Sequence, residues 1–397
     1  MAQQRKRIIF YLPVVTPWWF ANIVVHLIRV LAREHEVHVL VPPLWNNTGM
    51  GEEQIDLVAD LDHVIWYMLD GPDHPRLRVD ASSEEDLIAL VRDINPDFVL
   101  CRSADIVTPA RFPGIVRYIM EGAAPPVRTG ANWVTLSPSL FDHGLMPDLS
   151  LEQCAELDGL AAPIWEQMLQ EPVLPDRAEF LTMTGLPEDK IIIGLPLEYE
   201  QAENFFGQHH RYASNAEMIA AIAPMLSDDM VLAVTNHPLN ELYGDKKALE
   251  AALASLDGKA MLINGTKIAG QATLALTKQS DGMIVGNSKS WSACAAFATP
   301  MMRLSDFATG DWVQAYDQLP AFLAAIGDGS ATSADTVVAQ RWFAFHLANS
   351  IFDPGDPALT ADDLVSRMID PVQPERWEQA MARYQTQYQT QVIGQAA

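Results

Sequence analysis

Short apolar runs alternate with helix-like segments along this chain, and the pattern occurs twice. In the first half, Ile8 to Val15 is an apolar run that is ended by Pro17. Ala21 to Arg33 then carries apolar residues at helical spacing, and Glu36 to Val41 is apolar again. Strand, helix and strand in this order predict the start of a parallel α/β sheet.

The second half repeats the alternation. The strands expected there are Lys190–Leu197, Met230–Thr235, Ala260–Asn264, Gly282–Val285 and Pro300–Leu304. The helices expected between them are Asn215–Leu226, Lys246–Leu256, Gln271–Lys278 and Ser290–Ala298. Because 397 residues are too many for one core, we expect an α/β protein with two Rossmann-like, doubly wound domains. Their expected limits are 1–187 and 188–327, and residues 328–397 are expected to form a helical tail that packs back across the domains.

The charge and the cysteines exclude several classes of protein. With 51 acidic and 26 basic residues the formal charge is −25, which repels nucleic acid and anionic lipid. The three cysteines are widely spaced, so neither a disulfide framework nor a CxxC metal site is expected. No apolar run approaches the ~20 residues that span a bilayer. The sequence thus predicts a cytoplasmic protein with at most peripheral membrane contact and no nucleic-acid partner.

Familiar nucleotide and metal motifs do not occur. The sequence has no GxGxxG, no GxxxxGK[ST] and no HExxH. The sequence therefore offers no motif that would indicate a dinucleotide oxidoreductase, a P-loop NTPase or a zinc protease.

Two polar clusters follow strands of the second half, at the edge of the sheet where α/β enzymes bind ligands. Thr235 is followed by Asn236, His237 and Pro238, and a histidine there can donate to a phosphate. The second cluster lies just before a helix of small residues and consists of Gly286, Asn287, Ser288, Lys289 and Ser290. Backbone N–H groups and hydroxyls at such a helix start can bind an anion, although histidines and serines also serve simply as turn and cap residues.

These clusters carry a resemblance to a known family. A buried strand with an acidic tail, then His-Pro, then a serine-containing turn ahead of a further strand resembles the donor domain of GT-B glycosyltransferases that use CMP-sugars. The closest likeness is to the retaining β-Kdo transferases of capsule and lipopolysaccharide O-antigen synthesis. The stretches FYLPVVTPWWFANIVVHLIRVL and VPPLWNNTG resemble the same family. The resemblance implies a GT-B fold and implies that His237, Ser288 and Ser290 hold the CMP phosphate.

The resemblance also implies a carboxylate nucleophile soon after the strand that enters the second domain. The matching segment is LEYEQ, in which Glu200 is the best match and Glu198 the reserve. Both are glutamates where the family pattern has aspartate. A retaining transferase also needs a group that moves protons, and Glu121 or Asp142 could serve, each beside or near a glycine.

The function expected is transfer of Kdo or a related ulosonic acid from a CMP-sugar to a bacterial glycan or lipid-linked oligosaccharide. No cofactor is needed, because the CMP-sugar is a co-substrate and the scheme requires no metal. Inverting chemistry with Glu121 or Asp142 as the base stays open. Two other functions also stay open: a GT-B transferase or epimerase that uses a UDP-sugar, and a non-catalytic two-lobed sugar-binding protein. Arginines suit a sugar carboxylate, but no arginine is singled out.

Overall fold

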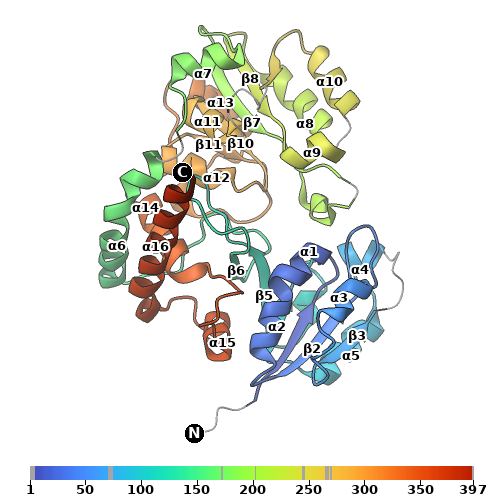
Figure 1. The fold of residues 1–397 in the computed structure, drawn as a ribbon. Coiled ribbons are helices and arrows are strands. Elements are labelled where there is room, and N and C mark those ends of the chain that lie inside the picture. The colour runs from blue at the N-terminus through green and yellow to red at the C-terminus, as the bar shows by residue number, and fades with distance from the viewer. Residues whose placement is uncertain are drawn as a thin grey trace. The chain divides into compact units, whose positions relative to one another are not determined.

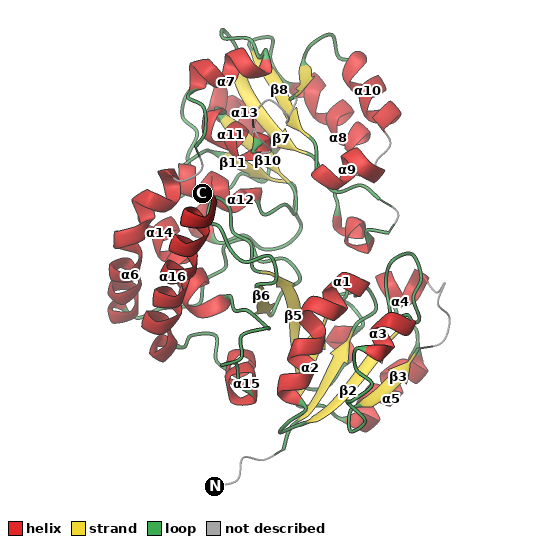
Figure 2. Ribbon diagram, in the orientation of Figure 1, coloured by secondary structure: helices red, strands yellow, loops and turns green. Residues whose placement is uncertain are grey.

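The chain forms two compact units in the computed structural model, which describes residues 5–69, 75–170, 173–201, 203–243, 246–263, 268 and 271–395. Unit 1 consists of residues 1–123, 129–141 and 347–380. Unit 2 consists of residues 124–128, 142–346 and 381–397. Each unit holds one β-sheet with helices packed on it (Figure 1; Figure 2).

Unit 1 contains a six-stranded sheet in the order β3-β2-β1-β4-β5-β6. All neighbours are parallel except β5 and β6, which are antiparallel. The strands are β1 (Arg7–Tyr11), β2 (Glu36–Val41), β3 (Ile65–Met68), β4 (Phe98–Cys101), β5 (Ile115–Glu121) and β6 (Val134–Ser137). The helices are α1 (Pro17–Trp19), α2 (Val25–Leu31), α3 (Glu52–Asp56), α4 (Pro75–Val79), α5 (Glu85–Ile94) and α15 (Ala361–Ile369), with a π-helical turn at Phe20–Val24 between α1 and α2.

The core of unit 1 contains residues from the N-terminal part of the chain together with residues 352–368. Apolar side chains of α2 and of the strands pack together with Leu364, Val365 and Met368 from α15. Val134 and Phe352 exchange two backbone hydrogen bonds, each 3.0 Å long. Residues near 350–370 therefore belong to the same core as residues 8–41.

Unit 2 contains a five-stranded, fully parallel sheet in the order β11-β10-β7-β8-β9. Its strands are β7 (Ile191–Pro196), β8 (Met230–Thr235), β9 (Ala260–Leu262), β10 (Gly282–Val285) and β11 (Met301–Arg303). Its helices are α6 (Leu151–Gln170), α7 (Arg177–Thr184), α8 (Asn215–Ile222), α9 (Pro238–Tyr243), α10 (Lys246–Ala254), α11 (Ala272–Gln279), α12 (Ser290–Phe297), α13 (Leu319–Gly327) and α14 (Thr336–Phe345). The last helix, α16 (Trp377–Gln395), starts in unit 1 and continues in unit 2.

Helices cover both faces of the second sheet. Apolar side chains of α8 and α13 pack on one face, against Ile193, Leu232 and Ile284. On the other face, Gly194 lets Leu276 of α11 approach so closely that a Cβ at this glycine would lie 3.0 Å from the Leu276 Cγ. Parallel strands buried on both faces are continuous apolar runs, which is why β7 reads IIIGLP.

The predicted fold class, α/β with two Rossmann-like sheets, is confirmed. The limits of the units differ from the expected division at 187 and 327, because α6 and α7 belong to unit 2 and residues 347–380 belong to unit 1. The strand β5 and the helix α13 were not predicted, whereas α15 lies within the helical tail expected at residues 328–397. The expected strand at 260–264 ends at Leu262, and Asn264 lies outside the described residues.

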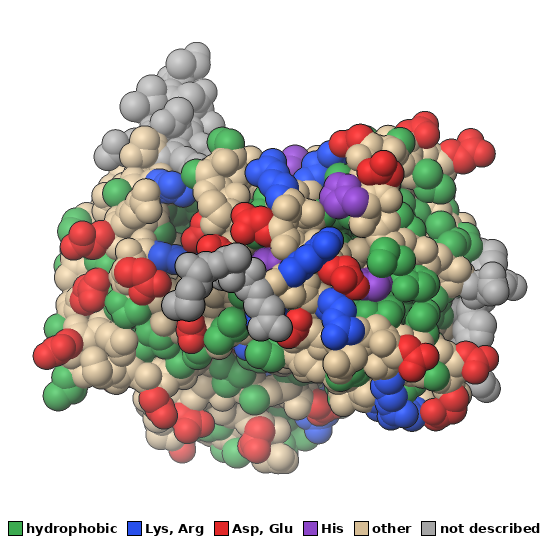
Figure 3. All heavy atoms as spheres, turned by 90° about the horizontal axis from the view of Figure 1, so that it is seen from below, with side chains coloured by type: hydrophobic (Ala, Val, Ile, Leu, Met, Phe, Trp, Pro, Cys, Tyr) green, Lys and Arg blue, Asp and Glu red, His purple; other side chains and the backbone are tan. Residues whose placement is uncertain are grey.

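Acidic side chains are spread over the face of the molecule drawn in Figure 3, with lysines and arginines between them. This spread agrees with the formal charge of −25. Among the described helices, none is long and apolar enough to cross a membrane.

Candidate functional site

The candidate site lies in unit 2, where the loops that follow β7, β8, β10 and β11 leave the carboxyl edge of the sheet. In parallel α/β sheets ligands bind at this edge, because the loops that follow the strands form a crevice there. The loop after β7 carries Glu198 and Glu200, and the one after β8 carries His237. The loop after β10 runs from Gly286 to Lys289 and leads into α12.

Two buried asparagines fix the loop that carries the glutamates. Asn215, the first residue of α8, accepts from the Glu198 N–H (3.0 Å) and donates to the Glu198 carbonyl (2.9 Å). Asn240 of α9 donates to the same carbonyl (2.7 Å) and accepts from the Glu200 N–H (2.8 Å). The side chains are only 7% and 5% exposed, so these bonds are shielded from water. The sequence interpretation gave neither asparagine a role.

The two carboxylates have different partners. Glu198 accepts from the Asn287 N–H through Oε1 (2.7 Å), and its Oε2 lies 3.6 Å from His210 Nε2. Glu200 accepts from the Asn215 N–H through Oε2 (2.8 Å), which places it at the N-terminus of α8. Among the described residues, Oε1 of Glu200 has no hydrogen-bond partner. Glu200 Oε1 is therefore not held by a hydrogen bond from this part of the protein, whereas Glu198 Oε1 is.

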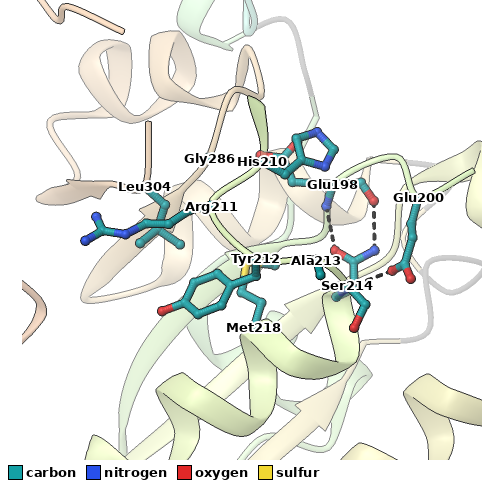
Figure 4. Close-up of a pocket in the computed structure, with 11 residues that line it drawn as sticks. Glu198, Glu200, His210, Arg211, Tyr212, Ala213, Ser214, Met218, Gly286 and Leu304 are labelled. Carbon is teal, nitrogen blue, oxygen red and sulfur yellow. Dashed lines mark hydrogen bonds and ion pairs between the residues drawn. The ribbon is translucent and has the colours of Figure 1, made fainter. Parts of the chain in front are cut away.

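A pocket lies against both glutamates (Figure 4). Its lining also includes Gly286, Leu304, Met218 and the segment from His210 to Asn215. Arg211 lines the pocket as well, but its guanidinium points away from the glutamates (Figure 4). The structure thus brings Glu198, Glu200 and Gly286 together at one pocket.

His237 can donate a hydrogen bond through its ring nitrogen Nε2. Its Nδ1 accepts from the Leu239 N–H (3.3 Å), so the neutral ring carries its proton on Nε2. Burial lowers the pKa of His237 below its ordinary value. Its ring stacks on Tyr199, between the two glutamates in sequence, with 5.2 Å between ring centroids. Asn236 accepts from Asn240 (3.1 Å), which ties the His-Pro turn to the glutamate loop.

The turn from Gly286 to Ser290 already holds a carboxylate. A Cβ added at Gly286 would overlap Glu198 Oε1, so only glycine leaves room for this carboxylate on the Asn287 N–H. The Ser288 and Ser290 hydroxyls lie 2.8 Å apart, and Ser288 also accepts from the Ser290 N–H (3.2 Å). One N–H of the turn, that of Asn287, is thus occupied by the Glu198 carboxylate.

The two predicted proton-transfer residues lie in different units. In unit 1, Glu121 accepts from Arg102 (2.8 Å), whose guanidinium also stacks on the Trp19 ring at 3.6 Å. In unit 2, Asp142 is exposed and accepts from the Leu145 N–H (3.0 Å) in a tight turn. Both carboxylates are thus ordered by local bonds.

The residue after Asp142 was not singled out from the sequence, although it is buried near the site. Burial and the nearby charges of Arg303 and Lys289 lower the pKa of His143 to about 2, so it is neutral at pH 7. Gly144, at φ +80°, lets the chain pass the rings of Trp291 and Trp312. Within the described part of the chain, no group of His, Cys, Asp or Glu side chains could hold a metal ion.

No protein-family model and no curated protein matches the sequence. Among solved structures, the chain is similar to the beta Kdo 2,7 transferase KpsC of Thermosulfurimonas dismutans, with 11% identity over 84% of this chain and 99% of that one and a TM-score of 0.45. The lipopolysaccharide outer core galactosyltransferase WaaB has 9% identity, coverage of 92% and 100%, and a TM-score of 0.38. The UDP-GlcNAc 2-epimerase of Neisseria meningitidis has 11% identity, coverage of 86% and 98%, and a TM-score of 0.33.

Proposed function

We propose that this protein is a retaining glycosyltransferase that moves Kdo or a related ulosonic acid from a CMP-sugar to a bacterial surface glycan. The observation that carries the proposal is the linkage of the glutamate loop, the His-Pro turn and the serine turn at one sheet edge. Asn240 links the first two, and the Glu198 carboxylate links the first to the third. A carboxylate can act as the nucleophile in transfer from a sugar phosphate, and a histidine donor and backbone N–H groups can stabilise the leaving phosphate.

In the first step, the donor phosphate takes hydrogen bonds from His237 Nε2–H and from the Ser288 and Ser290 hydroxyls. The free Oε1 of Glu200 attacks the anomeric carbon. A bond forms between this oxygen and the carbon, the bond from the carbon to the phosphate oxygen breaks, and CMP leaves with the electron pair. The donors stabilise the charge that develops on the leaving phosphate.

In the second step, an acceptor hydroxyl attacks the same carbon and displaces Glu200. The hydroxyl proton passes to a carboxylate, for which Glu121 and Asp142 are the candidates. Two inversions give net retention. Activity of Glu121→Gln and Asp142→Asn, measured side by side, identifies the base by the variant that loses acceptor transfer while still releasing CMP.

Calorimetry with CMP, UDP and GDP tests the donor. We expect selective binding of CMP by the wild type and at least a tenfold loss in His237→Ala. His63→Ala is the matched control, because His63 is an exposed histidine of unit 1. Equal or tighter binding of UDP would instead identify a UDP-sugar transferase or epimerase.

Mass spectrometry of the protein after mixing with CMP-Kdo tests the nucleophile. We expect a sugar adduct on the peptide that contains Glu200, and its absence in Glu200→Gln. An adduct that survives in Glu200→Gln but disappears in Glu198→Gln would assign the nucleophile to Glu198. Turnover without any adduct would contradict the double-displacement scheme.

A further inference from the structure

Arg303 is a buried cation at the end of a strand of unit 2. It ends β11, its residue is 5% exposed, and Nε, Nη1 and Nη2 find no partner among the described residues. Burying a charge is unfavourable unless the charge is paired and hydrogen-bonded. Burial lowers the pKa of Arg303 to about 10, which still leaves it charged at pH 7. Such a guanidinium has bonding capacity that the described part of the protein does not use.

The guanidinium lies beside the candidate site. Arg303 pairs across the sheet with Val285, the residue directly before the turn that starts at Gly286. The charge of Glu198 favours the protonated form of Arg303, so the two groups are near each other, yet they form no ion pair. Cys294 of α12 is a second neighbour. Arg303 thus lies on the β11 side of the strand that leads into the serine turn, while Glu198 follows the strand on its other side, β7.

Positively charged groups are gathered near Arg303, although the whole chain has a formal charge of −25. Arg303 and Lys289 both lower the pKa of His143, so two cations lie near this buried ring. His143 is neutral and adds no repulsion of its own against them. The turn itself contributes backbone N–H groups at the start of α12. An anionic ligand placed there would gain from two positive charges and from fixed dipoles, against the one negative charge of Glu198.

We propose that Arg303 binds the carboxylate of the donor sugar. This inference rests on the proposed function, and it names the group that selects an acidic sugar. The guanidinium offers a planar fork of N–H donors that matches a carboxylate with two parallel bonds. His237 and the two serines serve the phosphate, which leaves Arg303 for the second negative group of an ulosonic donor. A neutral sugar would leave the buried charge unpaired and is thereby disfavoured.

Calorimetry with separate parts of the donor tests this assignment. The probes are CMP alone, free Kdo in saturating CMP, and the methyl ester of Kdo in saturating CMP. In the wild type we expect Kdo to bind at least tenfold more tightly than its uncharged ester. Equal affinities would overturn the proposal, and this comparison requires no variant to fold.

Variants of Arg303 locate the group that binds the carboxylate. We expect Arg303→Met to lose at least tenfold in Kdo affinity with less than threefold change for CMP, and Arg303→Lys to lose most of that affinity because lysine lacks the fork. Arg92→Met is the control, since Arg92 is an exposed arginine on α5. If CMP affinity falls as much as Kdo affinity, Arg303 binds the phosphate and the proposal is wrong. If neither affinity falls, the proposal is also wrong.

The two proposals fail in different ways. If the wild type does not bind CMP, the proposed function fails, whatever the behaviour of Arg303. If the wild type binds CMP and Kdo, but Kdo binding does not depend on Arg303, only the carboxylate assignment fails.

Discussion

Replacing Gly286 with alanine should expel the Glu198 carboxylate from the serine turn. The three heavy atoms nearest to a Cβ at this position all belong to the Glu198 side chain, with Cδ at 2.8 Å. Gly286 is not among the glycines with positive φ, so alanine itself adds no backbone strain. The side chain of Glu198 must rotate away, and its bond to the Asn287 N–H is lost.

The size of the effect follows from two opposing terms. A hydrogen bond to a charged group contributes about 1.5–3 kcal/mol. Gly-to-Ala replacement at a compatible position stabilises by about 0.4–1 kcal/mol, because the unfolded chain loses freedom. We therefore expect Gly286→Ala to lower the free energy of unfolding by about 1–2 kcal/mol. In a Glu198→Ala background the same change should stabilise by about 0.4–1 kcal/mol.

A double-mutant cycle measures this coupling. The free energy of unfolding of unit 2 is read from urea-dependent amide exchange in β7, a central strand of its sheet, because a chain with two units need not unfold in one step. The expected coupling between the two substitutions is about 1.5–3 kcal/mol. An equal cost of Gly286→Ala in both backgrounds would show that the backbone, and not Glu198, demands glycine, and would refute the reasoning.

Three further predictions concern single side chains. His143 has a folded pKa of about 2 and an unfolded pKa near 6.5, so below about pH 6.5 the unfolded state binds more protons. The free energy of unfolding should therefore decrease by up to about 1.4 kcal/mol for each pH unit by which the pH is lowered. His143→Gln should flatten this slope in denaturation curves measured at pH 5–7. Asn240→Ala removes two bonds that hold the Glu198 loop and should lower kcat by tenfold or more while thermal melting shows a folded protein. Arg341→Ala breaks a partly exposed pair with Asp158 and should cost only about 0.2–1 kcal/mol in urea denaturation, less at high salt.

Most strands could be predicted from the sequence, because a parallel strand buried on both faces is a continuous apolar run. The strand β5 was missed because Arg117 interrupts its apolar run. Helix α13 was missed although Leu319, Phe322, Leu323 and Ile326 have helical spacing, so the signal was present in the sequence. The limits of the units could not be predicted, because the pairing of Val134 with Phe352 leaves no local pattern.

The candidate site could be predicted where a reactive side chain comes soon after a strand. Glu198, Glu200 and His237 each follow an apolar run closely; this position marked His237, and the family resemblance marked the two glutamates. Asn215 and Asn240 gave no such sign, because an asparagine at a helix start usually signals only a cap. Arg303 also ends a strand, but its burial and its lack of a partner exist only in the folded chain.

The interrupted path of unit 1 limits when that unit can be completed during synthesis. Its first two segments end at residue 141, and its third begins only at residue 347. At ~5–20 residues per second, the ribosome needs roughly ten to forty seconds to make the intervening part of unit 2. Throughout that time, the sheet of unit 1 lacks the apolar side chains of α15 and the backbone partner of Val134. Nascent unit 1 thus stays incomplete during that time, although its strands are the first to be made.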